Sequence, residues 1–321
     1  MHKRLHDRTI GVEIEYSNLS LNHSAKVIQE CFGGKIIQNS RYDFEVVDTK
    51  IGNFSLELDA QLLKKLAVDP TFAKVSQFFG EHDALSDLIE KTAITLVPYE
   101  VVCPPVAMDR LDLIDNLVNR LRLAGALGTT HAFQYAFGVH LNIQPPSFET
   151  KTILRIFQSF LILQPWLERQ TEVDITRKFS PFIESFDKEY LEYVLQDSYK
   201  PNKEHLIKDY ITFNPSRNRV LDMLPLFAYF DSDLVRSYLP KEKINPRPTY
   251  HYRLPNSKID LFHWNLADEL HLWQCVELLS KDDAAFFELK KHFLHYIGNF
   301  FSSKDEYVQK CHQCITDLLS Q

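Results

Sequence analysis

Residues 9–18, TIGVEIEYSN, alternate between large apolar side chains and small or acidic ones. Successive side chains of a β-strand point to opposite faces of the sheet, so this pattern predicts a strand with one apolar face. Glu13 and Glu15 then share the other face. At this spacing their carboxylates are ~6.6 Å apart along the strand and repel by about 2–3 kcal/mol at an effective dielectric constant near ~20. The segment therefore predicts a strand whose second face is acidic.

Four other segments show the same division into an apolar and a polar face. They are FSLELDA (54–60), VPYEVVC within a strand at 94–102, FGVHLNI within a strand at 134–144, and RPTYHYRL within an extended segment at 247–255. Their polar faces carry Glu57 and Asp59; Glu100; His140 and Asn142; and Arg247, His251 and Arg253. We expect these groups to come together if the strands belong to one sheet.

The order of the elements predicts an α+β fold. Strand patterns dominate the first part of the chain, with an antiparallel pair at 42–48 and 54–60 around Gly52-Asn53. Helical spacing follows at 150–168, 187–196, 203–213, 232–239, 264–280, 283–301 and 304–319, after earlier helices at 20–32, 71–92 and 109–124. We expect a mainly antiparallel sheet with helices on one face.

Composition narrows the class of protein. The 321 residues carry a net charge of −7, which argues against a general nucleic-acid binder. The first residues, MHKRLHDR, lack the apolar core of a signal peptide, and no apolar run reaches the ~20 residues of a membrane-spanning helix, so we expect no membrane association. The five scattered cysteines favour a reducing, cytoplasmic setting. We interpret Cys311 and Cys314 of CHQC as neighbours on a terminal helix rather than half of a zinc site.

Two interpretations of the polar faces stay open. Half-exposed antiparallel sheets commonly carry a solvated face. Such a face usually mixes Thr, Lys, Ser and Gln, whereas here the first four strands offer carboxylates, His and Asn without lysine. Oxygen-rich clusters favour Mg²⁺ or Mn²⁺, so we favour a divalent metal site. On this reasoning Glu13→Gln abolishes activity and leaves stability unchanged, because it relieves like-charge repulsion.

The late strand brings the opposite charge. Arg247 and Arg253 suit phosphate, because a guanidinium binds oxyanions through two parallel hydrogen bonds. Arg217 and Arg219 of PSRNR either extend this set or are surface charges near a helix start. The chain has no P-loop and no GxGxxG motif, so a nucleotide would be held by metals and side chains.

Six segments in order resemble the amidoligases, carboxylate–amine ligases of the glutamine synthetase and glutamate–cysteine ligase superfamily. They are GVEIEYS, LELDA, VPYEVVCPP, FGVHLNIQPPS, NPSRNRVLDMLPLF and RPTYHYRLPN, and the likeness covers residues 9–280. The resemblance implies a glutamine synthetase-like catalytic fold with a curved antiparallel sheet over 1–280. Residues 281–321 are then expected to form a C-terminal helical extension packed on the same domain.

The resemblance also implies metal ligands. Glu13 and Glu15 match the paired glutamates that bind divalent metal in the family, and Glu100 matches another ligand. Glu57, and less directly Asp59, would line the metal and acyl-acceptor site. His251 stands where many superfamily members carry glutamate, and imidazole also binds metals but without the negative charge.

Phosphate and catalytic roles follow from the same resemblance. His140 and Asn142 would lie near the metal and the nucleotide phosphates, and Arg253 would contact the transferred phosphate. On the charge argument given above, Arg247, Arg217 and Arg219 are further candidates for binding the nucleotide. Glu57 or Asp59 would deprotonate the incoming amine.

The implied reaction joins a small-molecule or peptide carboxylate to an amine, with ATP and Mg²⁺ or Mn²⁺ required. ATP converts the carboxylate into an acyl phosphate, and the amine displaces phosphate. A metal-dependent hydrolase or nuclease with the same acidic cluster stays an alternative. A non-catalytic descendant that binds nucleotide is a second alternative, because His251 replaces the usual glutamate. A kinase acting on a guanidino or carboxyl group is a third. The sequence indicates neither the particular substrates nor the oligomeric state.

Overall fold

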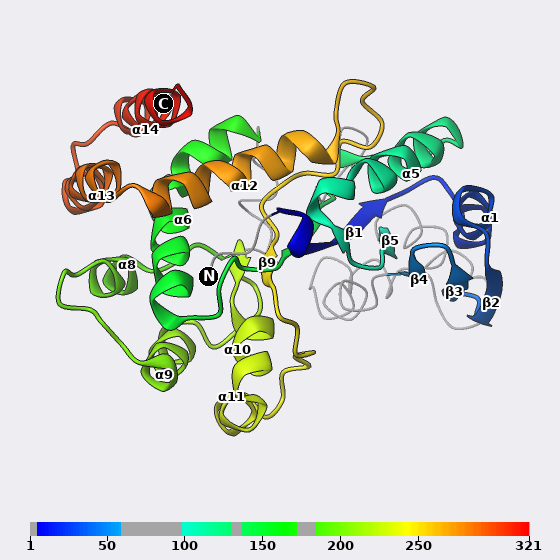
Figure 1. The fold of residues 1–321 in the computed structure, drawn as a ribbon, viewed down its shortest axis with the longest axis horizontal. Coiled ribbons are helices and arrows are strands. Elements are labelled where there is room, and N and C mark those ends of the chain that lie inside the picture. The colour runs from blue at the N-terminus through cyan, green and yellow to red at the C-terminus, as the bar shows by residue number, and fades with distance from the viewer. Residues whose placement is uncertain (1–4, 59–97, 130–136, 172–183, 321) are drawn as a thin grey trace, which may run out of the picture.

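A large antiparallel sheet forms the centre of the protein. The computed structural model describes residues 5–58, 98–129, 137–171 and 184–320 (Figure 1). The strands lie in the order β2-β3-β4-β5-β1-β7-β9-β8, and β6 pairs with the start of β1. Their bounds are β1 Thr9–Tyr16, β2 Lys35–Ser40, β3 Asp43–Thr49, β4 Gly52–Leu58, β5 Tyr99–Val102, β6 Val106–Ala107, β7 Val139–Ile143, β8 Leu221–Asp222 and β9 Tyr250–Tyr252. Each neighbouring pair is antiparallel.

Helices occupy most of the second half of the described chain. They are α1 Leu21–Phe32, α5 Asp112–Leu123, α6 Thr150–Gln170, α8 Lys188–Val194, α9 Lys203–Phe213, α10 Leu224–Phe230, α11 Ser232–Tyr238, α12 Leu266–Lys281, α13 Asp283–Gly298 and α14 Lys304–Leu319. The expected α+β class with a mainly antiparallel sheet is confirmed. Among the described helices, none combines the length and the apolar character needed to cross a lipid bilayer.

The apolar face of the sheet packs against helices, as the alternation predicts. Figure 1 shows α12 running alongside α6 and toward α5, and both α5 and α6 contact it. The rings of Tyr250 and Tyr252 of β9 lie 5.2 and 5.4 Å from the ring of Trp273 on α12. At the other end of the sheet, Phe32 of α1 stacks on Phe54 of β4 at 5.4 Å. Burial of these aromatic surfaces holds the helices on this face.

A buried ion pair ties the start of β1 to α12. The Arg8 guanidinium donates two hydrogen bonds to the Glu277 carboxylate, at 2.8 and 2.5 Å, and a third to the Gln144 carbonyl at 2.8 Å. The Trp273 indole nitrogen donates to Glu277 at 2.8 Å. Both charged side chains are almost fully buried, so each neutralises the charge of the other. The pair therefore connects the residue that precedes β1 to the helix α12.

The strongest sequence patterns produced the expected elements. β1, α1 and the antiparallel pair β3–β4 lie where the alternation and the glycines place them. The Gly33 residue caps α1 with a positive φ of 75°, which suits glycine. The expected strand at 94–102 begins at Tyr99 within the described residues, and the one at 247–255 is limited to β9. The predicted helix at 71–92 lies outside the described residues.

Short or irregular elements were missed. The β2 strand is an edge strand with mostly exposed side chains, so it has no apolar face to reveal it. The β6 and β8 strands have two residues each. The helix α10 is an almost continuously buried run that begins next to Pro225, and it lacks helical periodicity.

The last two helices pack on the rest of the chain. The Tyr307 hydroxyl of α14 donates to the Ile162 carbonyl of α6 at 2.8 Å. The Cys311 and Cys314 side chains lie on α14, as expected. Burial raises the pKa of the Cys311 thiol to about 12 and that of Cys314 to about 11, so neither is activated as a thiolate at neutral pH.

Candidate functional site

The sheet register aligns the polar side chains of six strands into one row. Across β4, β5 and β1, Glu57 faces Glu100 and Glu100 faces Glu15. Across β1 and β7, Glu13 faces His140. The row continues over β7, β9 and β8 as Asn142, His251 and Asp222, each opposite the next. We call these eight residues the polar row. The polar faces predicted from separate segments thus form a single surface.

Glu13 is the most enclosed carboxylate of the predicted ligands, with 7% of its surface exposed. One of its oxygens, Oε1, accepts from Asn142 Nδ2 at 3.0 Å and from Arg247 Nη1 at 2.5 Å. The other oxygen, Oε2, lies 3.0 Å from His140 Nδ1. Three donors from β7 and from the segment before β9 therefore converge on one side chain of β1.

Burial alone would raise the pKa of Glu13, but the hydrogen bond from His140 and the charge of Arg247 reverse this effect. The pKa of Glu13 consequently lies well below its ordinary value, and the carboxylate is ionised at neutral pH. Burial lowers the pKa of His251 well below the ordinary range, even though Glu13 acts in the opposite direction. His251 is therefore a neutral imidazole beside an ionised carboxylate.

Two further carboxylates, those of Glu15 and Glu100, lie close to the His140 ring. His140 Nε2 lies 3.6 Å from Glu15 Oε1, and His140 Nδ1 lies 3.9 Å from Glu100 Oε1. The remaining Glu15 oxygen accepts from the Gly138 amide at 2.5 Å, which orients the carboxylate. Glu15 and Glu100 are half-buried, whereas His140 is buried.

These residues form two overlapping groups that could hold metal ions. One is Glu13, His140 and His251, and the other is Glu15, Glu100 and His140; within each group the ligand atoms lie within 4.8 Å of one another. Ligands at about 2.0–2.3 Å from a common ion are separated by distances of this size. Glu13, His140, Asn142 and His251 are buried, whereas the side chains of a solvated face would be exposed to water. Burying polar groups is costly unless they are hydrogen-bonded, as these four are to one another.

The acyl-acceptor candidates lie at one end of the row. Glu57 is exposed on β4 and faces Glu100 directly. Asp59 lies outside the described residues. Glu57 is thus next to the acidic group without being enclosed by it.

The arginines divide into two sets. Arg247 reaches Glu13, and its Nη1 also donates to Asn142 Oδ1 at 3.2 Å. Arg253 Nη1 donates to the Arg217 carbonyl at 2.8 Å, which holds these two arginines together. Arg219 instead donates to the Ser185 carbonyl, and its guanidinium lies 5.6 Å from the ring centre of Phe186. Arg219 therefore points toward the segment that contains Ser185 and Phe186.

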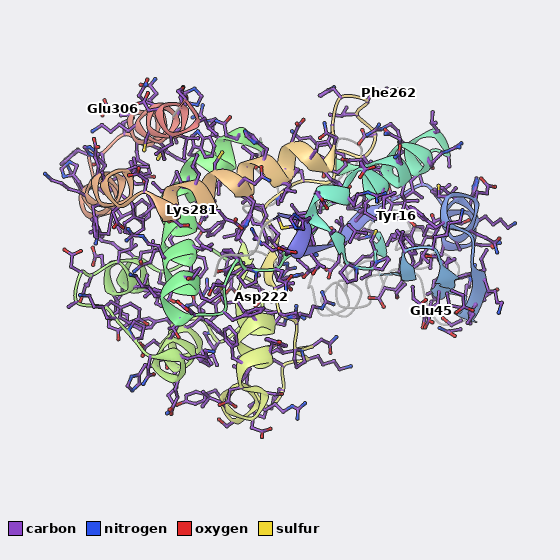
Figure 2. All side chains as sticks on the ribbon, in the orientation of Figure 1. Tyr16, Glu45, Asp222, Phe262, Lys281 and Glu306 are labelled. Carbon is purple, nitrogen blue, oxygen red and sulfur yellow. The ribbon has the colours of Figure 1, made fainter. Side chains whose placement is uncertain are left out.

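Asp222 is a site residue that the sequence analysis missed. It is fully buried on β8, and its carboxylate accepts from Arg217 Nε at 3.0 Å and from the Leu224 amide at 3.0 Å. Burial raises the pKa of Asp222, against the effect of the nearby Arg217 and Arg253 charges. Its only sequence signal was an acidic residue inside the apolar run VLDMLPLF. Figure 2 shows Asp222 near the centre of the molecule, whereas Glu45 lies on β3, the strand next to the β2 edge of the sheet.

A family model described as "putative amidoligase enzyme" matches residues 6–275. The chain belongs to the amidoligase family. All predicted site residues, from Glu13 to Arg253, fall within the match, which ends inside α12. The helices α13 and α14 follow the amidoligase region. Searches of curated proteins and of solved structures found no significant match.

Proposed function

We propose that this amidoligase is an ATP-dependent carboxylate–amine ligase with a glutamine synthetase-like catalytic fold, and that it forms an amide through an acyl phosphate. The observation that carries the proposal is the polar row. It brings two overlapping ligand groups and a set of arginines to one surface. Metal ions and arginines together are the equipment of phosphoryl transfer, where positioning and charge neutralisation do most of the catalysis.

Five side chains would hold divalent cations, Mg²⁺ or Mn²⁺. They are Glu13, Glu15, Glu100, His140 and His251. The mixture of carboxylate oxygens and imidazole nitrogens fits such ions, and the ligand atoms are close enough to share one. When bound, the cations would neutralise the negative charge of the ATP phosphates.

Three arginines, Arg247, Arg217 and Arg253, would bind phosphate oxygens. Arg247 is anchored on Glu13 through Nη1 and is still about one-third exposed, so part of its guanidinium faces solvent. Arg217 is held by the Asp222 carboxylate, and Arg253 is held by the Arg217 carbonyl. Guanidinium groups whose positions are fixed before binding lose less entropy when phosphate arrives.

The reaction has two steps. A carboxylate oxygen of the acid substrate attacks the γ-phosphorus of ATP; a P–O bond forms, and the bond to ADP breaks. The amine nitrogen then attacks the acyl carbon, the C–N bond forms, and inorganic phosphate leaves with the bonding electrons. The ammonium proton must first be removed, and the candidate bases are Glu57 and Asp59. Glu57 lies opposite Glu100 on the neighbouring strand, and its side chain is exposed.

Phosphate release from ATP tests the proposal. The protein is incubated with ATP, Mg²⁺ or Mn²⁺, and pooled carboxylic acids and amines, and each pool is then omitted in turn. We expect release that requires an acid, with an amide product that requires both pools. Glu15→Gln should remove this turnover. Glu45→Gln is the matched control, because Glu45 belongs to the same sheet but lies away from the polar row.

The other outcomes identify the alternatives. Cleavage of nucleic acid or esters without ATP consumption would support a hydrolase. Thermal stabilisation by ATP without any turnover would support a nucleotide-binding descendant. A phosphorylated product that is stable and requires no amine would support a kinase.

A further inference from the structure

The contacts of Asn142 determine which way its side-chain amide points. One end of the amide faces Glu13 Oε1 at 3.0 Å, and the other end faces Arg247 Nη1 at 3.2 Å. An ionised carboxylate can only accept a hydrogen bond, and a guanidinium can only donate one. The end that faces Glu13 must therefore be the NH₂ group, and the end that faces Arg247 must be the oxygen. This orientation follows from chemistry alone.

The fixed amide determines the tautomer of His251. The same Asn142 oxygen lies 2.8 Å from His251 Nδ1. Since the oxygen can only accept, Nδ1 must carry the hydrogen. In a neutral ring, Nε2 is then the unprotonated nitrogen. The opposite tautomer would place two lone pairs against each other at this distance in a buried site, and a hydrogen bond would be lost.

Glu13 acts on His140 in the same way. The Glu13 oxygen Oε2 lies 3.0 Å from His140 Nδ1, so Nδ1 donates and Nε2 carries the lone pair in the neutral ring. His140 Nε2 faces Glu15 Oε1 at 3.6 Å. In that form the Nε2 lone pair and the Glu15 oxygen face each other, at a separation that suits two ligands of one cation.

We propose that Asn142 is a positioning residue that, together with Glu13, holds His140 and His251 as the Nδ1–H tautomers, so that both rings offer Nε2 to a divalent cation. This inference rests on the proposed metal-dependent function. It also changes the role expected for Asn142 from the sequence. The Asn142 oxygen already accepts from Arg247 and His251, so both of its lone pairs are used and this oxygen is not a direct metal ligand.

Nitrogen NMR of the histidine rings provides the direct test. Long-range proton–nitrogen spectra of the metal-free, ¹⁵N-labelled full-length protein distinguish the two tautomers, and His140→Gln and His251→Gln assign the signals. We expect both rings to show a protonated Nδ1 and an unprotonated Nε2. A wild-type His251 signal with the proton on Nε2 would overturn the inference.

Two substitutions at Asn142 separate positioning from a general structural role. Asn142→Ala removes the acceptor, so we expect the His251 ring to lose its tautomer preference and Mn²⁺ affinity, measured by calorimetry, to fall about 10–100-fold. Asn142→Asp keeps an oxygen opposite Nδ1, so the His251 tautomer should be retained. Asn214→Ala is the matched control, because Asn214 is a buried amide on the Tyr210 carbonyl. It should leave both readouts unchanged.

The results also separate this inference from the proposed function. An Asn142→Ala protein with wild-type tautomers and wild-type Mn²⁺ affinity would refute the positioning role even if the enzyme is a ligase. Conversely, the expected tautomers and Mn²⁺ affinities without ATP turnover would support the positioning role and refute the ligase. Neither measurement uses catalytic activity as its readout.

Discussion

Glu13→Gln tests whether the hydrogen-bond network around this carboxylate stabilises the fold. The sequence reasoning predicted no loss of stability, since the substitution relieves repulsion between acids. The structure leads to the opposite expectation. Glu13 accepts hydrogen bonds from His140, Asn142 and Arg247 in a buried setting, and these donors outweigh the repulsion. Removing the charge should therefore destabilise the protein.

The magnitude follows from the three contacts. Hydrogen bonds to a charged group contribute about 1.5–3 kcal/mol, against about 1 kcal/mol for a neutral pair. In Glu13→Gln one oxygen still accepts from Asn142 and Arg247, but as a neutral acceptor. The new amide N–H meets the His140 Nδ1–H, so the third hydrogen bond is lost. We expect the free energy of unfolding at pH 7 to fall by about 2–4 kcal/mol.

The effect should depend on pH in a defined direction. The pKa of folded Glu13 lies well below its ordinary value of 4.5, because the hydrogen bond from His140 and the charge of Arg247 outweigh burial. The stability that this carboxylate contributes is complete above pH 4.5 and is lost as pH falls through the lower folded-state pKa. Glutamine cannot gain a proton, so the gap between wild type and Glu13→Gln should narrow in acid.

Urea denaturation followed by circular dichroism measures both effects. The titrations are run with a chelator, so that no cation contributes, at pH 7 and at a series of lower pH values. Glu45→Gln should stay within about 0.5 kcal/mol of wild type at pH 7, because Glu45 is only half-buried on β3 and lies away from the polar row. Equal stabilities of wild type and Glu13→Gln at pH 7, or a gap that does not narrow in acid, would refute this reasoning.

Three further predictions concern other parts of the molecule. Glu277→Gln should lower the free energy of unfolding, measured by urea denaturation, by about 3–5 kcal/mol, because it leaves the buried Arg8 charge without its carboxylate. Asp48→Asn, in the exposed pair with Lys35, should have little effect. Comparable losses in the two variants would contradict the buried-pair argument. Cys314 should resist iodoacetamide in the native protein near neutral pH, since its pKa is raised to about 11 by burial first and by acidic neighbours second; rapid alkylation detected by mass spectrometry would show otherwise. Asp222→Asn should raise the KM for ATP about tenfold or more, with a smaller change in kcat, because Arg217 loses its charged anchor; an unchanged KM would exclude Arg217 from phosphate binding as proposed.

The sequence by itself determined the strands and the direction of their side chains. Alternation in a strand is a local property, so Glu13 with Glu15, and His140 with Asn142, could be assigned to the polar face without knowing their neighbours. The buried tyrosines flanking His251 were assigned to the apolar face for the same reason, and they do pack on α12. Strands of two residues, such as β8, could not be predicted in this way, because two residues are too few to show an alternation.

Only the tertiary structure decided which polar groups meet. Local patterns do not encode sheet order or register, and a shift of one residue would turn a side chain to the other face. Register places Glu15 opposite Glu100 and Glu13 opposite His140, and it is packing over long sequence separations that brings Arg247 onto Glu13. Repulsion between neighbouring acids could not by itself describe Glu13, because the donors that surround it come from segments more than a hundred residues away.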